Sequence, residues 1–295
     1  MTNRRRTKAL RAVELGHDHD VVDLGQLDFI EPCQDGAVVV GYLTGGTPAP
    51  EFIDSMLAMQ EYDFATNRFM SRKGGGRIQL ISGPRVAEGR TQLVYNWLTS
   101  ELLADSDWFL MLDDDMCFDA DLLARLMAVA HYPDRPIVGG LCFCGQHYGR
   151  QWPTIYELYQ DDDGVGFGCR PVMDYPRDAL VKVGATGGAC LLVHRQVYKG
   201  MAAAPGNQTT ASGAPNPYPW FKEGKVAPDG APLGEDIYFC RLANVLGIPI
   251  HVNTSAKLGH VKPAMLTERT FEVQMADEIA ELAGKLETGD YEVVT

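Results

Sequence analysis

Short apolar runs and segments with helical spacing alternate along the first half of the chain. Each run is continuous enough to be a strand buried on both faces, and each following segment repeats apolar residues every three or four positions. The expected strands and helices follow one another as 37–43, 51–62, 77–82, 88–103, 108–112 and 120–131. This order predicts an α/β fold with three layers, in which a mostly parallel, right-handed central sheet is flanked by helices.

The second half of the chain is less regular. Strands are expected at 137–143, 189–193 and 248–252, with a helix at 233–246. A stretch rich in Pro, Gly and Asn at 205–234 is expected to be a functional lid on the acceptor side or a disordered segment, because long loops are uncommon in compact domains. We therefore divide the chain into an N-terminal extension at 1–35, an α/β domain at 36–262 and a C-terminal amphipathic helix at 263–295. That helix packs on its own domain or forms a homodimer contact.

Composition and charge narrow the class of function. The chain has 295 residues, 45% of them hydrophobic and 22% charged, as in globular proteins. Its net charge of −13 repels polyanions, so we expect neither nucleic acid nor an anionic membrane as a partner. With no apolar run long enough to span a bilayer, and with seven cysteines, an odd number, we expect a soluble cytoplasmic protein with reduced thiols.

Three consecutive carboxylates close the apolar run 108–112. Such neighbours repel one another, and a divalent cation removes that cost. Alternate residues of a strand point the same way, so Asp113 and Asp115 can face one ion while Asp114 faces elsewhere. Oxygen ligands suit Mg²⁺ or Mn²⁺. The alternative interpretation is a solvated acidic turn or helix cap.

The segment Trp108-Phe109-Leu110-Met111-Leu112-Asp113-Asp114-Asp115-Met116 resembles the Asp-X-Asp strand end of the GT-A glycosyltransferases, including family-2-like members. Two later segments agree in order and spacing. Gly187-Gly188-Ala189-Cys190-Leu191-Leu192-Val193-His194-Arg195 resembles the glycine turn and strand that line their sugar pocket. Gly234-Glu235-Asp236-Ile237-Tyr238-Phe239-Cys240, followed by Gly247-Ile248-Pro249-Ile250 and Gly259-His260, resembles their Glu-Asp helix start, strand and metal-binding histidine. The likeness covers about residues 37–262.

The resemblance implies roles for the polar residues of these segments. Asp113, Asp115 and His260 would hold Mn²⁺ or Mg²⁺ against the donor diphosphate, with Asp113 or Asp114 also near the ribose. Asp236 would accept the proton of an acceptor hydroxyl, and Glu235 would orient it or contact the acceptor. The alternatives are a surface histidine and two acids that only complement a helix dipole.

The resemblance also implies a donor-binding set. Arg90, rather than Arg85, would bind phosphate, and an ordinary surface arginine is the alternative. Trp220, in an aromatic patch of the expected lid, would stack on a sugar or simply anchor the loop. The remaining expected donor contacts are Tyr42 and Thr44 beside the nucleoside, with Tyr42 otherwise a core residue, and Gly187 and Gly188 at the sugar.

We therefore expect a metal-dependent glycosyltransferase that uses a nucleoside diphosphate sugar. The Gln-X-X-Arg-Trp motif of processive synthases is replaced by Arg241-Leu242-Ala243-Asn244, so transfer should be non-processive. The acceptor would be a protein or a small glycan, and the small layout resembles glycosyltransferases encoded by phages. A sugar-1-phosphate nucleotidyltransferase is disfavoured because the loop 43–48 has no basic residue. A non-catalytic sugar-binding protein is the other alternative.

Overall fold

The computed structural model describes residues 35–81, 85–145, 151–160, 167–204, 218–225 and 232–262, with β1 (Val21–Val22) and five helical residues between 272 and 280. It divides into two compact units, residues 1–144 with 152–261, and residues 145–151 with 262–295. Most of the expected N-terminal extension, lid loop and C-terminal helix lies outside the described residues. None of the described helices has the length and apolarity needed to cross a bilayer.

A nine-stranded mixed sheet forms the centre of the first unit. Most of its strands point the same way, while β5, β11 and β13 run in the opposite direction. The expected α/β class, with a mostly parallel sheet between helices, is confirmed. In spatial order the strands are β1, β11 (Leu180–Val183), β16 (Ile250–His260), β6 (Ile137–Leu141), β13 (Cys190–His194), β4 (Trp108–Asp113), β2 (Val38–Thr44) and β3 (Arg77–Ile81), and β5 (Met116–Phe118) pairs with β16.

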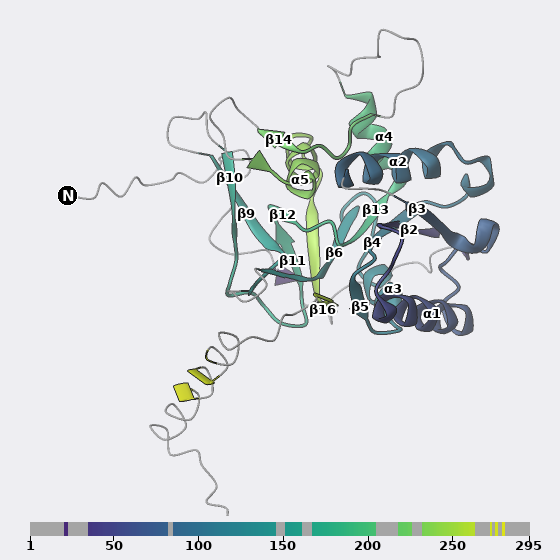
Figure 1. Ribbon diagram of the computed structural model, residues 1–295. Helices are drawn as coiled ribbons and strands as arrows, with labels where there is room; N and C mark the ends of the chain where they lie inside the picture. Colours follow the sequence, from purple (N-terminus) through teal and green to yellow (C-terminus); the bar gives the residue numbers. More distant parts are fainter. Residues whose placement is uncertain are drawn as a thin grey trace, which may run out of the picture. The chain divides into compact units, whose positions relative to one another are not determined.

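Helices cover both faces of this sheet (Figure 1). On one face lie α1 (Pro50–Ala65) and α3 (Leu122–Met127), and on the other lie α2 (Val86–Thr99), α4 (Arg195–Ala203) and α5 (Glu235–Val245). Because side chains alternate along a strand, β4 contributes Phe109 and Met111 to one hydrophobic core and Leu110 and Leu112 to the other. The sheet therefore separates two hydrophobic cores, as expected for strands that are apolar on both faces.

One close approach places a ring of β4 against the backbone of β2. The Phe109 ring lies directly over Gly41, so that a Cβ built at Gly41 would be 2.0 Å from the ring atom Cζ. The same ring stacks on Trp97 of α2, with ring centroids 5.1 Å apart. Glycine at position 41 thus lets a large ring fill the layer between sheet and helix without a void.

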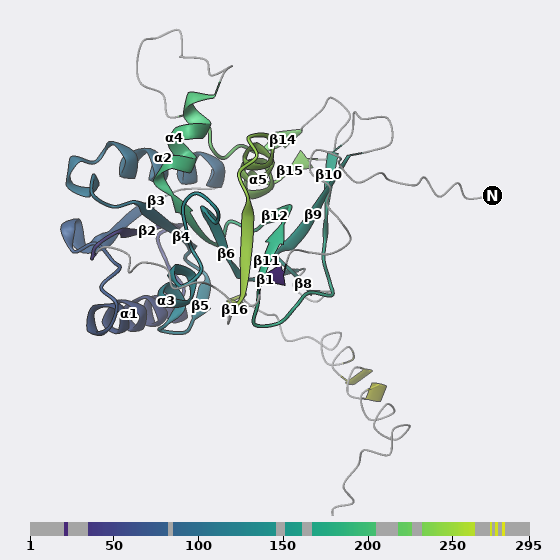
Figure 2. The same ribbon diagram turned by 180° about the vertical axis from the view of Figure 1, so that it is seen from behind.

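Three smaller sheets are present besides the nine-stranded sheet. Figure 2 shows β9 and β10 beyond β11, on the side of the large sheet that ends in β1. Gln160 of β9 pairs with Phe167 of β10, and the residues between them lie outside the described residues. Their bounds are β9 (Ile155–Gln160), β10 (Phe167–Pro171) and β12 (Ala185–Thr186), followed by β7 (Phe143–Gly145) with β8 (Gln151–Pro153), and β14 (Gly224–Lys225) with β15 (Pro232–Leu233).

Candidate active site

A buried arginine joins three segments at the carboxyl end of β4. Arg90 of α2 is only 3% exposed, and its Nη2 donates to both carboxylate oxygens of Asp113 at 2.7 and 3.0 Å. Its Nη1 donates to the carbonyl of Gly188, and its Nε lies 3.2 Å from a carboxylate oxygen of Glu235. Burial alone lowers the pKa of Arg90, but Asp113, Glu235 and Asp236 raise it overall. Arg90 is therefore a permanent cation that neutralises these acids.

The glycine turn before β13 makes room for this arginine. A Cβ at Gly188 would lie 2.6 Å from Arg90 Nη1 and 2.8 Å from its Cζ. The preceding Gly187 faces Asp236, since a Cβ there would be 3.8 Å from Asp236 Oδ2. The sequence predicts this turn as a sugar-pocket wall, and the structure places it between the arginine and the acids of α5.

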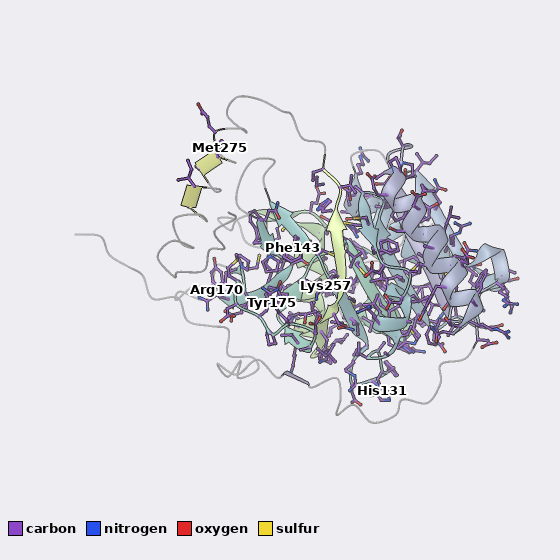
Figure 3. The ribbon with its side chains drawn as sticks, turned by 90° about the horizontal axis from the view of Figure 1, so that it is seen from below. His131, Phe143, Arg170, Tyr175, Lys257 and Met275 are labelled. Atoms are coloured by element: carbon purple, nitrogen blue, oxygen red, sulfur yellow. The ribbon has the colours of Figure 1, made fainter. Side chains whose placement is uncertain are left out.

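Asp115 and His260 form a second pair, where β5 meets the end of β16. The backbone N–H of Val261 donates to the Asp115 carbonyl at 2.8 Å, and His260 Nε2 lies 2.9 Å from Asp115 Oδ2. His260 Nδ1 lies 3.1 Å from the carbonyl oxygen of Phe143, which Figure 3 labels beside the strand β16. Both side chains are about one quarter to one third exposed, at 22% for His260 and 35% for Asp115.

Both ring nitrogens of His260 face oxygens that only accept hydrogen bonds. A carbonyl cannot donate, so Nδ1 carries a proton. Nε2 then has two states: it is also protonated and forms an ion pair with Asp115, or its lone pair and the carboxylate share a cation. A backbone carbonyl that fixes the other nitrogen is the usual arrangement behind a histidine that binds a metal.

The expected metal ligands are only partly brought together. Asp115 and His260 are in contact, whereas the carboxylate of Asp113 is engaged by Arg90. Across the described residues, no group of three or more His, Cys, Asp or Glu side chains is arranged to hold a metal. One carboxylate and one imidazole nevertheless suit an ion such as Mn²⁺ that takes its other ligands from a bound phosphate. Asp114 contributes its carbonyl, which accepts from the Ala49 N–H at 2.9 Å.

Asp236 lies in the first turn of α5. Its Oδ1 accepts the N–H of Ile237 at 2.7 Å, and its other neighbours are the glycine turn and Glu235. Burial raises the pKa of Asp236, and the Glu235 carboxylate raises it further, while Arg90 and two backbone N–H groups oppose the change. A buried carboxyl with a raised pKa is a suitable general base.

The other residues expected to contact the donor are mostly packed into the protein. Tyr42 is 8% exposed and donates to Gln79 Oε1 at 3.1 Å, and Thr44 is 2% exposed and accepts from the Gly46 N–H at 3.0 Å. Trp220 is 3% exposed, and its indole N–H donates to the Tyr198 carbonyl at 2.9 Å. Trp220 thus anchors its segment on α4 and offers little ring surface to a sugar. Arg85 is exposed at the N-cap of α2.

Sequence reasoning missed two contributors to the site. Phe143 acts through its backbone carbonyl, which any residue type would supply, so no sequence signal could have found it. Tyr156 of β9 places its hydroxyl 3.3 Å from the Cys144 sulfur, and burial and Asp236 both raise its pKa. No strand is expected from the sequence at 155–160, so Tyr156 carried no signal either.

No protein-family model and no curated protein matches the chain. Among solved structures, A197 from STIV is 13% identical over 78% of this chain and 96% of its own, with a TM-score of 0.42. GalNAc-T7 with UDP, GalNAc and Mn²⁺ is 10% identical, covering 77% of this chain and 43% of its own, with a TM-score of 0.49. An inositol-1-phosphate CTP transferase from T. maritima is 10% identical over 81% and 96%, with a TM-score of 0.38. At these values the likeness concerns the fold alone.

Proposed function

We propose that the protein is a metal-dependent glycosyltransferase that uses a nucleoside diphosphate sugar as donor. The observation that carries the proposal is the Asp115–His260 pair, in which an imidazole whose second nitrogen is fixed by a carbonyl faces a carboxylate at 2.9 Å. It lies at the end of the sheet where ligands bind in open α/β folds.

Asp115 and His260 would hold the ion, and Asp113, fixed by Arg90, would face the ribose. The bound Mn²⁺ or Mg²⁺ supplies positive charge for the donor diphosphate and for the nucleoside diphosphate that leaves. The Arg90–Asp113 pair keeps its carboxylate in one orientation, because two parallel hydrogen bonds restrict rotation. Donor affinity therefore depends on Arg90 through Asp113.

Asp236 would act on the acceptor. Its carboxylate accepts the proton of an acceptor hydroxyl while that oxygen forms a bond to the anomeric carbon. The bond between that carbon and the diphosphate oxygen breaks, and its electron pair leaves with the nucleoside diphosphate. Glu235, held by Arg90 at 3.2 Å, raises the pKa of Asp236 and strengthens it as a base. Direct attack of this kind inverts the anomeric configuration.

Calorimetric titration with a panel of nucleoside diphosphates, with Mn²⁺ and after chelation, tests the donor site. One nucleotide should bind in a metal-dependent way, and Asp115→Asn and His260→Ala should abolish that binding. Asp119→Asn, an exposed acid just after β5, is the matched control. Metal-independent binding that is equal in all variants would contradict the proposed site.

Turnover of the corresponding sugar nucleotide tests the reaction. Asp236→Asn should bind the donor as the wild type does and fail to transfer the sugar. Release of the nucleoside diphosphate with inversion supports the assignment, whereas retention would remove Asp236 from the role of base. Release of pyrophosphate from a nucleoside triphosphate and a sugar phosphate would instead show a nucleotidyltransferase.

A further inference from the structure

A cavity of about 240 Å³ lies at the opposite end of the sheet from the candidate active site. Its lining comes from the residues just before β2, β3 and β4, whereas Asp113 closes β4 at the other end. Five residue steps of β4 separate the two ends, which is roughly 17 Å at the usual rise of a strand. The two sites therefore share no residue.

The part of the cavity lining that precedes β3 contains a residue with a strained backbone conformation. Arg68 has φ of 59°, in the left-handed region that side chains other than Gly and Asn rarely adopt. Its own N–H donates to the Asp63 carbonyl at 2.7 Å, and its carbonyl accepts from Gly36 at 2.9 Å. The Asp63 carboxylate accepts the next two backbone N–H groups, of Phe69 and Met70. The backbone is thus forced to place an arginine at the cavity where asparagine or glycine would fit with less strain.

The same wall continues into a tight glycine turn. Gly74, Gly75 and Gly76 all have positive φ, at 61°, 74° and 67°. A Cβ at Gly76 would lie 2.2 Å from the carbonyl oxygen of Ser71, so the chain folds back on itself there. This turn brings Arg72 and Lys73 to the lining beside Arg68.

The charges of the lining are only partly matched. Three cations, Arg68, Arg72 and Lys73, face two anions, Asp35 and Asp105. Lys73 pairs with Asp105, and the Arg72 guanidinium lies 5.5 Å from the Phe64 ring centroid. Within the part of the chain that the structure describes, no ion pair involves Arg68 or Arg72. The charge of Arg72 opposes the rise that burial causes in the pKa of Asp63, but the Asp63 carboxylate oxygens are already occupied by two backbone N–H groups. In a molecule of net charge −13, the two arginines without an ion pair among the described residues leave a local site for an anion.

We propose that this cavity binds a small phosphate-bearing molecule, held by the guanidinium groups of Arg68 and Arg72. Planar guanidinium groups bind phosphate oxygens through paired hydrogen bonds, and the cavity has room for a phosphate with a short organic part. Asp35 is the one lining acid without an ion pair among the described residues, and it suits a hydroxyl donor on that organic part. The site is separate from the proposed donor site, and its test does not depend on transferase activity.

The experiment is calorimetric titration of the full chain with inorganic phosphate and, separately, with glucose 1-phosphate, at constant ionic strength. The wild type should bind in a saturable way. Arg68→Asn, which suits the left-handed backbone, and Arg72→Gln should each weaken binding about tenfold or more. Arg77→Gln, an exposed arginine on the adjoining strand that does not line the cavity, is the control and should bind as the wild type does.

A gain-of-affinity variant gives an independent arm. Asp105→Asn frees Lys73 from its ion pair at the cavity, so phosphate should bind several-fold more tightly. Arg68→Asn should also keep or raise the melting temperature, because it relieves backbone strain, so its loss of binding is not explained by unfolding. Tighter binding of the ester than of inorganic phosphate identifies an organic ligand, and equal binding identifies the inorganic anion. Absence of saturable binding, or wild-type affinity in Arg68→Asn and Arg72→Gln, overturns the proposal.

Discussion

The Arg90–Asp113 pair allows a quantitative test of how the candidate active site is held together. Replacing Arg90 by Met removes a cation whose side chain is 4% exposed, and leaves Asp113 and Glu235 without their partner. Breaking a buried ion pair from one side costs about 3–5 kcal/mol. Asp113→Asn keeps one acceptor at a side chain that is 29% exposed, so its expected cost is smaller, about 1.5–3 kcal/mol.

Urea unfolding of the wild type, both single variants and the double variant measures the coupling energy. Each single variant already removes the ion pair, so the double variant should be destabilised by less than the sum of the two single variants. We expect this difference, the coupling energy, to be about 2 kcal/mol or more, in line with two charge-assisted hydrogen bonds. Exposed ion pairs give about 0.2–1 kcal/mol in the same analysis. A coupling in that lower range would refute the view that this pair is buried and rigid.

Three further predictions concern single positions. Gly188→Ala should displace the Arg90 guanidinium and weaken donor binding. Gly200→Ala is the control, because an added Cβ there meets nothing within 4 Å. Equal donor affinities of the two variants would contradict the close packing at Gly188. Asp236→Asn should raise the melting temperature at pH 7.5, because burial raises the pKa of Asp236 and the ionised carboxylate therefore destabilises the native state. This gain should shrink towards pH 4, where the carboxyl is protonated in the native state. A gain that does not change with pH would argue against burial of Asp236 as the cause. His194 caps α4 by accepting the Gln196 N–H at 3.2 Å, and burial lowers its pKa, so its contribution is complete above pH 6.5 and is lost as the pH falls through the lowered value. In His194→Asn the melting temperature should therefore drop less between pH 7.5 and 5.5 than in the wild type, and an identical drop would exclude His194 as its source.

The sequence predicts the parts of the fold that depend on continuous apolar runs. The run ending at Asp113 is β4, and the helical spacing of Phe52, Met56 and Met59 is the buried face of α1. Strand direction was not predictable in the same way, because a buried antiparallel strand such as β13 has the same apolar run as a parallel one. The order Asp, Asp, Asp after an apolar run placed the acids at the strand end, as the structure does.

The sequence predicted which residues form the candidate site better than it predicted where their side chains point. His260 and Asp115 are 145 positions apart, and only the resemblance of the segments around them brought them together before the structure did. Arg90 was expected to be a phosphate ligand, but its guanidinium is occupied by protein groups, because α2 directs it inward beneath Gly188. Side-chain direction of this kind depends on the packing of α2 on the sheet, which residue types alone do not determine.

The Phe109 ring over Gly41 has a consequence for how this sequence can change over time. Gly41 and Phe109 share one volume between neighbouring strands. A larger side chain at position 41 therefore requires a smaller one at position 109. Neither substitution is tolerated by itself, since one creates an overlap and the other a void. Sequences that diverged from this one should therefore vary at the two positions together, with total volume preserved.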